Sequence, residues 1–331
     1  MSARTSVDAG GRGGARPPRP RAVTAAVAVL AVLVVVAVLV TAGGPVLAGH
    51  PVYPALLAVT LLVAVVALVR AVRRRRPPPR RSAWRRAAGL LVAVLAVGWV
   101  AALWWLRPFG AQEPALAALT SDDAVTVTQT PTTLVLAPTG APEGTTGTAL
   151  LLQPGARVDA RAYAAVVRPL AAAGHLVVVP KQPLGIAFLS LGALDAARDA
   201  HPDVERWVVG GHSLGGTAAA VEAVDAGAEG TPVAGLLLWA SYPADDVSST
   251  LDARVLSVSA SEDGLATPAD ITASVADLPP GAELVVVEGA VHAFFGDYGP
   301  QPGDGTPTVD RATARAEITA ASLGLLDEVS G

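Results

Sequence analysis

The stretch that decides the fold is Gly211-His212-Ser213-Leu214-Gly215-Gly216. It has the pattern Gly-x-Ser-x-Gly, and it stands between a valine-rich run at 206–209 and an alanine-rich run at 214–226. In a sharp turn between a strand and a helix, such a serine exposes its hydroxyl at the edge of a sheet. Glycines leave room for the neighbouring backbone, and the helix behind the serine offers free N–H groups at its positive end. The pattern therefore predicts Ser213 as a nucleophile.

The sequence around this turn alternates between strand-like and helix-like segments. Short β-rich runs indicate strands at 125–130, 132–137, 148–152, 175–179, 206–209, 233–239, 255–259 and 284–287. Segments typical of helices lie between and after them, at 159–173, 186–200, 214–226, 268–277 and 309–329. Short buried strands that alternate with helices are typical of a parallel sheet with helices on both faces. We therefore expect an α/β domain with a mainly parallel sheet over 123–331.

A serine nucleophile of this kind needs an acid and a histidine, which follow it along the chain in that order. His292 is the only histidine after Ser213, and it comes in a loop after the last expected strand. Asp263, which follows the strand at 255–259, is the first choice for the acid. Four other acids stay open as alternatives: Glu262, Asp270, Asp245 and Asp246. Ser241 is the alternative nucleophile, because it also ends a strand, although it lacks the flanking glycines.

The oxyanion of such a reaction needs two backbone N–H donors. Leu214, the residue after the nucleophile, is expected to supply one of them. The other is expected from the loop Gln153-Pro154-Gly155-Ala156, which follows the strand at 148–152. Within this loop the N–H of Ala156 is favoured over that of Gly155. Because the chain has no cysteine, a thiolate nucleophile, a cysteine metal site and a disulfide are excluded.

Several longer motifs stand in order along 150–326. They are Pro154-Gly155, Trp207 leading into 210–216, Ala240-Ser241-Tyr242-Pro243, the run Ser-Glu-Asp-Gly-Leu-Ala-Thr at 261–267, and the run His-Ala-Phe-Phe-Gly-Asp-Tyr-Gly-Pro-Gln-Pro-Gly-Asp-Gly at 292–305. With these motifs the chain resembles the α/β-hydrolase fold-5 family, which is distantly similar to dienelactone hydrolases. The resemblance implies the α/β-hydrolase fold and hydrolase chemistry more directly than it implies a substrate.

Two residues beside the expected site depart from the pattern of that family. Relatives often carry tyrosine where Gln153 stands and glutamine where Phe294 stands. We therefore expect the range of substrates to differ. Dienelactone hydrolases use a cysteine nucleophile, and this chain has no cysteine, so their activity is not carried over.

Three apolar stretches come before the hydrolase-like part, at 22–42, 52–69 and 87–106. Each is long enough to cross a bilayer as a helix, which needs about 20 residues. Two alternatives remain: buried core helices, which usually carry more polar residues, and a cleaved signal peptide, whose apolar core is usually shorter than 22–42. We expect a membrane region of three transmembrane helices at 22–107, after a disordered basic tail at 1–21 and before a linker at 108–122.

The arginines are distributed unevenly around these stretches. The tail and the second connection, 70–86, are rich in arginine, whereas the first connection, 43–51, has no arginine or lysine. Cytoplasmic loops carry the excess of basic residues. The N-terminus and the second connection are therefore expected in the cytoplasm, and the hydrolase domain on the outer side of the cell membrane. The arginine-rich connection is expected to bind anionic lipid headgroups rather than nucleic acid.

Together these features predict a membrane-anchored serine hydrolase that cleaves a carboxylic ester through an acyl-enzyme. The expected partners are the lipid bilayer and a small-molecule or envelope ester, with no cofactor, metal or nucleic acid. An acyltransferase that uses an alcohol in place of water is one alternative. A catalytically inactive binding module is another, although the intact Ser213, Asp263 and His292 argue against it.

Overall fold

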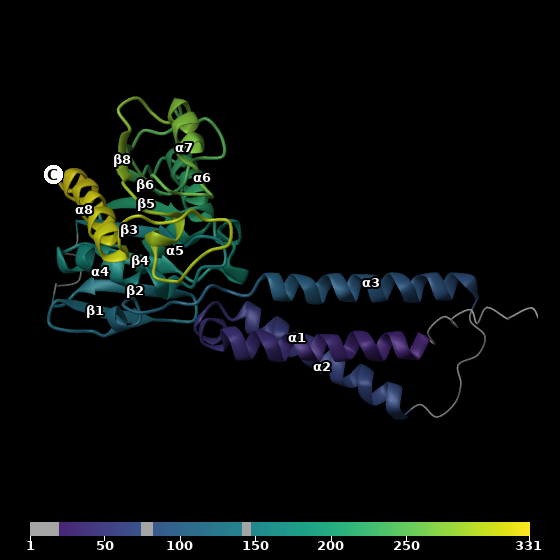
Figure 1. Ribbon diagram of the computed structural model, residues 1–331. Helices are drawn as coiled ribbons and strands as arrows, with labels where there is room; N and C mark the ends of the chain where they lie inside the picture. Colours follow the sequence, from purple (N-terminus) through teal and green to yellow (C-terminus); the bar gives the residue numbers. More distant parts are fainter. Residues whose placement is uncertain (1–19, 74–81, 141–146) are drawn as a thin grey trace, which may run out of the picture. The chain divides into compact units, whose positions relative to one another are not determined.

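The computed structural model describes residues 20–73, 82–140 and 147–331 (Figure 1). The chain forms two compact units. One takes its described residues from Met1–Val36 and Ala58–Leu103, and the other from Ala37–Leu57 and Trp104–Gly331. Most of the predicted basic tail and the central arginines of the second connection lie outside the described residues.

In the described part of the chain, three helices are long and apolar enough to cross a membrane, which confirms the prediction of three apolar helices of that length. They are α1 (Pro20–Ala48), α2 (Val52–Arg73) and α3 (Ala83–Trp105), each somewhat longer than predicted. The backbone of α1 is not helical at Ala42, three residues before Pro45. Proline has no N–H to donate to the carbonyl four residues earlier, so it interrupts the helix at this point.

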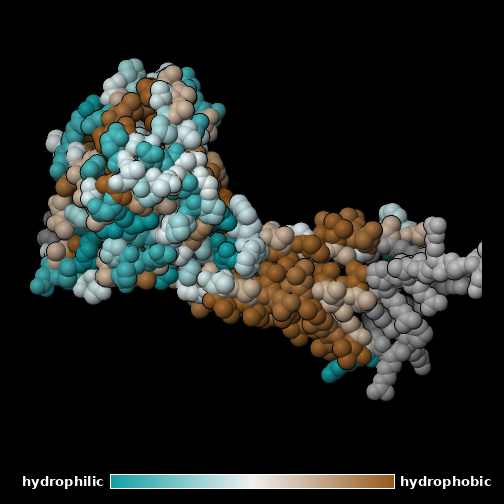
Figure 2. Space-filling model, viewed as in Figure 1, coloured by the Kyte–Doolittle hydropathy of each residue, from teal (hydrophilic) through white to brown (hydrophobic). Residues whose placement is uncertain are grey.

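Small residues bring the helices of the first unit together. Ala28, Ala31, Ala64 and Val100 form a buried cluster. Many leucine and valine side chains on the same helices are exposed instead, and the surface over the helices is strongly hydrophobic (Figure 2). This arrangement is typical of membrane helices, because lipid solvates leucine as well as a protein core does, whereas small residues let backbones approach closely.

The second unit contains an eight-stranded sheet in the order β1-β2-β4-β3-β5-β6-β7-β8. β1 and β2 are antiparallel to their neighbours, and β3 to β8 run parallel to one another. The strands are β1 (Val125–Gln129), β2 (Thr133–Pro138), β3 (Thr148–Gln153), β4 (Leu176–Pro180), β5 (Arg206–His212), β6 (Gly235–Trp239), β7 (Arg254–Ala260) and β8 (Glu283–Val287). The mainly parallel sheet is confirmed, and the carboxyl ends of its six parallel strands meet at one edge.

Helices cover both faces of this sheet (Figure 1). The α-helices are α4 (Ala164–Ala172), α5 (Ala193–Ala200), α6 (Leu214–Ala228), α7 (Pro268–Ser274) and α8 (Arg311–Ser330), and the short 3-10 helices are η1 (Ala117–Leu119), η2 (Ala160–Tyr163), η3 (Pro183–Gly185), η4 (Ala187–Leu189), η5 (Val275–Asp277) and η6 (His292–Phe295). Leu150 and Leu152 of β3 pack with α4 and α8, whereas Ala149 and Leu151 pack with α5 and α6. This alternation follows from the two-residue period of a strand.

The helix predicted at 186–200 is shorter than expected. Only α5 is α-helical there, and the residues before it form the 3-10 turns η3 and η4. Ile186 has φ −117° and ψ 110°, and Ser190 has φ −132° and ψ 26°. Both conformations lie outside the α-helical region, so the α-helix begins only after them, at Ala193.

The segment 108–122, expected to be a linker, is attached to the sheet-containing part of the second unit. Phe109 donates its N–H to the carbonyl of Arg157 at 2.7 Å and accepts from the N–H of Asp159 at 2.9 Å. Farther along, Gln112 donates to the carbonyl of Asp297 at 2.7 Å, and Ala115 is fully buried. The compact unit therefore begins before residue 123. Backbone hydrogen bonds attach this segment to the unit, and the amino-acid composition of the segment does not reveal them.

Candidate active site

Ser213 stands on the turn between β5 and α6. Its backbone has φ 53° and ψ −126°, a region that residues with a Cβ rarely enter and that costs about 1–3 kcal/mol. The N–H of Ser213 donates to the carbonyl of Trp239 at 2.9 Å, and its own carbonyl accepts from Ser241 Oγ at 2.6 Å. These two bonds hold the strained turn, which leaves the half-buried Ser213 at the carboxyl edge of the sheet.

Close packing requires the glycines on either side of Ser213. A Cβ on Gly211 would lie 2.2 Å from the carbonyl carbon of Gly215. A Cβ on Gly215 would lie 2.1 Å from the carbonyl oxygen of Gln153. Both obstructing atoms belong to the backbone, so they cannot move aside. Only glycine at these positions lets the start of α6 approach β3 and β5 so closely.

The alternative nucleophile, Ser241, has a structural role. Its side chain donates to the carbonyl of Ser213, and the residue is only 3% exposed. A Cβ on Gly216 would lie 2.5 Å from Ser241 Oγ, so the hydroxyl has no open space on that side. We infer that Ser241 supports the turn rather than attacking a substrate.

Asp263 and His292 form a buried hydrogen-bonded pair. The distance from His292 Nδ1 to Asp263 Oδ2 is 2.8 Å. The other carboxylate oxygen, Oδ1, accepts the backbone N–H groups of Leu265 at 2.7 Å and Ala266 at 2.8 Å. Among the described residues His292 Nε2 has no hydrogen-bond partner. The pair follows β7 and β8, so it lies at the same edge of the sheet as Ser213, with the second imidazole nitrogen unoccupied.

In the described part of the chain, no hydrogen bond joins any of the four alternative acids to this histidine. Asp270 caps α7 together with Thr267, and Asp246 accepts the N–H of Ser248 at 2.9 Å. Glu262 and Asp245 are exposed, and neither bonds to the imidazole in the described part of the chain. Asp263 is therefore the acid that we retain for the proposed site.

Asp304 holds the loop that carries His292. Its carboxylate accepts the backbone N–H groups of His292 at 3.1 Å, Ala293 at 2.9 Å and Gly305 at 2.8 Å. Three such bonds fix the path of the backbone on which the imidazole is mounted. Sequence reasoning missed this role, because Asp304 lies inside the motif at 292–305 without any spacing that distinguishes it.

His212, next to Ser213, is a second buried histidine beside His292. The two ring centroids are 4.5 Å apart, and His212 stacks on Phe295 at 5.6 Å with an interplanar angle of 14°. Burial, followed by the proximity of His292, lowers the pKa of His212 well below its ordinary value. Its Nδ1 lies 2.9 Å from the hydroxyl of Tyr163. A neutral His212 therefore packs beside His292 without adding a charge.

The two candidates for the second oxyanion donor differ in their partners. The N–H of Gly155 donates to the hydroxyl of Tyr163 at 2.8 Å, so it is occupied. The N–H groups of Ala156 and Leu214 have no partner among the described residues. Leu214 is the first residue of α6, where an unpaired N–H and the positive end of the helix dipole favour negative charge. We retain Leu214 and Ala156 as the donors.

The chain is similar to known proteins in sequence and in fold. The sequence profile of the alpha/beta hydrolase family matches residues 149–316, just over half of the chain. A proposed dienelactone hydrolase from Klebsiella pneumoniae is 18% identical with a TM-score of 0.46, covering 62% of this chain and 98% of that chain. A predicted CIB-like hydrolase from Thermoplasma acidophilum is 13% identical with a TM-score of 0.47, covering 62% of this chain and 100% of that one. No curated protein matched the sequence. Through the profile match, the chain belongs to the alpha/beta hydrolase family.

Proposed function

We propose that the protein is a membrane-anchored serine hydrolase that cleaves carboxylic esters. The observation that carries this proposal is the buried hydrogen bond between Asp263 and His292 Nδ1. The other nitrogen of the same imidazole, Nε2, has no hydrogen-bond partner among the described residues. A histidine held in this way is suited to take a proton from a serine at the same edge of the sheet. The strained backbone of Ser213, between required glycines, supports the same role.

In the first half of the proposed reaction, Ser213 Oγ forms a bond to the carbonyl carbon of the ester while His292 Nε2 takes the hydroxyl proton. Asp263 keeps the imidazole oriented and stabilises its positive charge. The oxyanion accepts hydrogen bonds from the backbone N–H groups of Leu214 and Ala156. When the tetrahedral intermediate collapses, the bond to the alcohol breaks, and His292 returns the proton to the departing oxygen.

In the second half, water attacks the acyl-serine. His292 Nε2 takes a proton from this water as the new C–O bond forms. Collapse of the second tetrahedral intermediate breaks the bond to Ser213 Oγ, which recovers its proton from His292. The products are a carboxylic acid and an alcohol. No metal or organic cofactor enters this sequence of steps.

The short loop between β6 and β7 supports the proposal that the substrate is small. It runs over residues 240–253 and contains neither helix nor strand. A short connection at this place has no room for a lid domain of the kind that covers a long-chain lipid. We therefore propose a small ester, or an acyl group on an envelope molecule, as the substrate class.

Covalent labelling tests the proposed chemistry. The full-length protein in detergent is expected to react with a fluorophosphonate probe and to form one adduct, at Ser213 by peptide mass spectrometry. It should also hydrolyse p-nitrophenyl acetate and butyrate faster than the palmitate. A folded protein that neither labels nor hydrolyses any ester in the series would contradict the proposal and favour a binding module.

The proposed location is the cell membrane, with the hydrolase domain outside. It is supported by the three apolar helices and by the concentration of arginine in the tail and the second connection. Three spans from a cytoplasmic N-terminus bring residues 108–331 to the outer face.

Reporter fusions test this topology. A reporter that is active only after export, fused after Gly331, is expected to be active, and a reporter active only in the cytoplasm is expected to be silent at the same place. Fusions after His50 and after Pro78 serve as matched controls, because they should report the outer side and the cytoplasm respectively. A cytoplasmic signal at Gly331 together with an outer signal at Pro78 would show that the orientation is inverted.

A further inference from the structure

Arg157, next to the proposed oxyanion donor Ala156, has an unusual backbone. Its φ is 61°, and the N–H of Val158 donates to the carbonyl of Gly155 at 3.0 Å, which closes a four-residue turn. A positive φ at the third position marks a turn that normally carries glycine there. An arginine in this position is strained, so something else must hold it.

Backbone contacts hold Arg157 from two sides. Its N–H donates to the carbonyl of Gly185 at 2.7 Å, and its carbonyl accepts from the N–H of Phe109, also at 2.7 Å. The approach to Gly185 is so close that a Cβ on that glycine would lie 2.7 Å from Arg157 Cα. The turn is therefore fixed between the η3 loop and the segment that follows α3.

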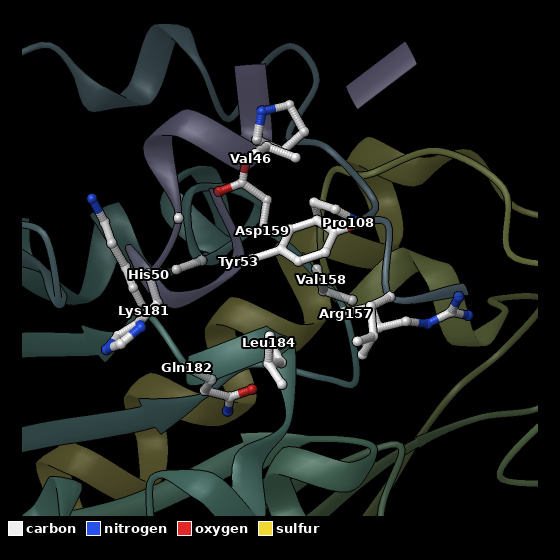
Figure 3. A pocket seen from close by; sticks show the side chains of 15 residues that line it. Val46, His50, Tyr53, Pro108, Arg157, Val158, Asp159, Lys181, Gln182 and Leu184 are labelled. Atoms are coloured by element: carbon white, nitrogen blue, oxygen red, sulfur yellow. The ribbon is translucent and has the colours of Figure 1, made fainter. Parts of the chain in front are cut away.

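The side chain of Arg157 adds a third contact to the same segment. Its guanidinium donates to the carbonyl of Trp105, the last residue of α3. It also lies over the rings of Trp105, at 4.5 Å from the centroid, and Phe109, at 4.9 Å. Figure 3 shows the cleft that this turn borders, lined by Arg157 and Pro108 together with Tyr53 from the start of α2. All of these residues belong to the second unit.

The Ala156 N–H and the strained Arg157 belong to the same turn, which the hydrogen bond from Val158 to Gly155 closes. On one side of Ala156, the N–H of Gly155 is held by Tyr163. On the other side is Arg157, in the strained conformation. If Arg157 relaxed to a negative φ, the peptide planes on either side of it would rotate, and the turn that carries the Ala156 N–H would change shape. An oxyanion donor must be fixed in advance of the reaction to be effective.

We propose that Arg157 is a positioning residue for the oxyanion hole, and that Trp105–Phe109 acts as the clamp that keeps its backbone left-handed. The inference rests on the proposed function, because it takes Ala156 as an oxyanion donor. It gives the end of the third apolar helix a part in catalysis: the chain that leaves the helix also shapes the site.

The test compares two substitutions in the full-length protein. Arg157→Ala removes the guanidinium contacts and keeps a Cβ that disfavours positive φ, so kcat on p-nitrophenyl butyrate should fall at least about tenfold while KM stays within about twofold. Arg157→Gly also removes the side chain but adopts positive φ without strain, so kcat should stay within about threefold of wild type. Arg198→Ala is the matched control, because Arg198 bonds the carbonyl of Thr231, away from the site, and it should change neither constant.

A double-mutant cycle tests the clamp itself. Trp105→Ala should lower kcat about threefold in the wild-type background and have no further effect in the Arg157→Gly background, since the two residues act through one contact. Thermal unfolding would reveal whether Arg157→Ala fails to fold. In that case the comparison of Trp105→Ala in the two backgrounds still tests the inference. Equal losses of kcat in Arg157→Ala and Arg157→Gly would overturn the inference. So would a raised KM with normal kcat, because Arg157 would then bind substrate.

The outcome is distinguishable from failure of the proposed function. If Ser213→Ala retained hydrolysis, the proposed chemistry itself would be wrong. If Ser213→Ala were inactive but Arg157→Ala had a normal kcat, only the positioning role would fail.

Discussion

Replacing Ser213 with alanine is expected to lower kcat on p-nitrophenyl butyrate by at least about four orders of magnitude. The substitution removes the atom that would form the acyl-enzyme, and the hydroxyl of the alternative nucleophile, Ser241, is bonded to the carbonyl of Ser213. The fold should persist, because alanine keeps the Cβ of serine and adds no atom to the tightly packed turn. Steady-state kinetics and thermal unfolding of the two proteins measure both effects, and probe labelling should disappear.

Ser241→Ala is the matched control for this experiment. The hydroxyl of Ser241 supports the carbonyl of Ser213, so its loss should weaken the turn while leaving the proposed nucleophile in place. We expect kcat to stay within about tenfold of wild type and labelling to remain at Ser213, since the cost is one buried hydrogen bond of about 1 kcal/mol. Labelling that survives in Ser213→Ala and is lost in Ser241→Ala would reverse the assignment.

Asp263→Asn is expected to lower kcat by at least about 10²-fold with little change in melting temperature. The backbone N–H groups of Leu265 and Ala266 both donate to Oδ1, so the amide oxygen of asparagine should occupy that position. Its NH2 group then faces His292 Nδ1 in place of Oδ2. The imidazole must accept that hydrogen bond, which moves its own proton to Nε2. In this tautomer His292 cannot take the proton from Ser213.

Two exposed acids provide the comparison. Asp245→Asn and Asp246→Asn should stay within about tenfold of wild type, because solvent-exposed carboxylates contribute little. The same kinetic assay applied to all three variants decides between them. An active Asp263→Asn beside an inactive Asp245→Asn or Asp246→Asn would show that the acid follows β6, and the assignment made here would be wrong.

Local patterns in the sequence were sufficient to predict much of this protein. The mainly parallel sheet was predictable because short β-rich runs alternate with helical segments. The three apolar helices were predictable because length and hydropathy are properties of one segment at a time. Ser213 and His292 could be proposed for a similar reason, since the serine has a local motif and only one histidine follows it.

Contacts between distant segments could not be predicted in this way. The choice among Asp263 and the alternative acids depended on which loop faces His292, and that is set by the pairing of β7 with β8. The sequence favoured Ala156 over Gly155, and the structure adds a physical reason, because the hydroxyl of Tyr163 occupies the N–H of Gly155. In each case the candidates offered the same kind of group, a carboxylate or a backbone N–H, and a partner from another element distinguished them.

The segment after the third apolar helix shows most clearly the difference between what local sequence patterns predict and what tertiary contacts decide. Pro108 and Pro114 indicated a linker at 108–122, and the sequence by itself determined only that a helix ends before it. Tertiary structure decided that Phe109 pairs with the backbone on both sides of Val158 and that Trp105 contacts Arg157. Backbone N–H and carbonyl groups are the same in every residue except proline, so a hydrogen bond between two distant chains leaves no trace in the identity of their side chains.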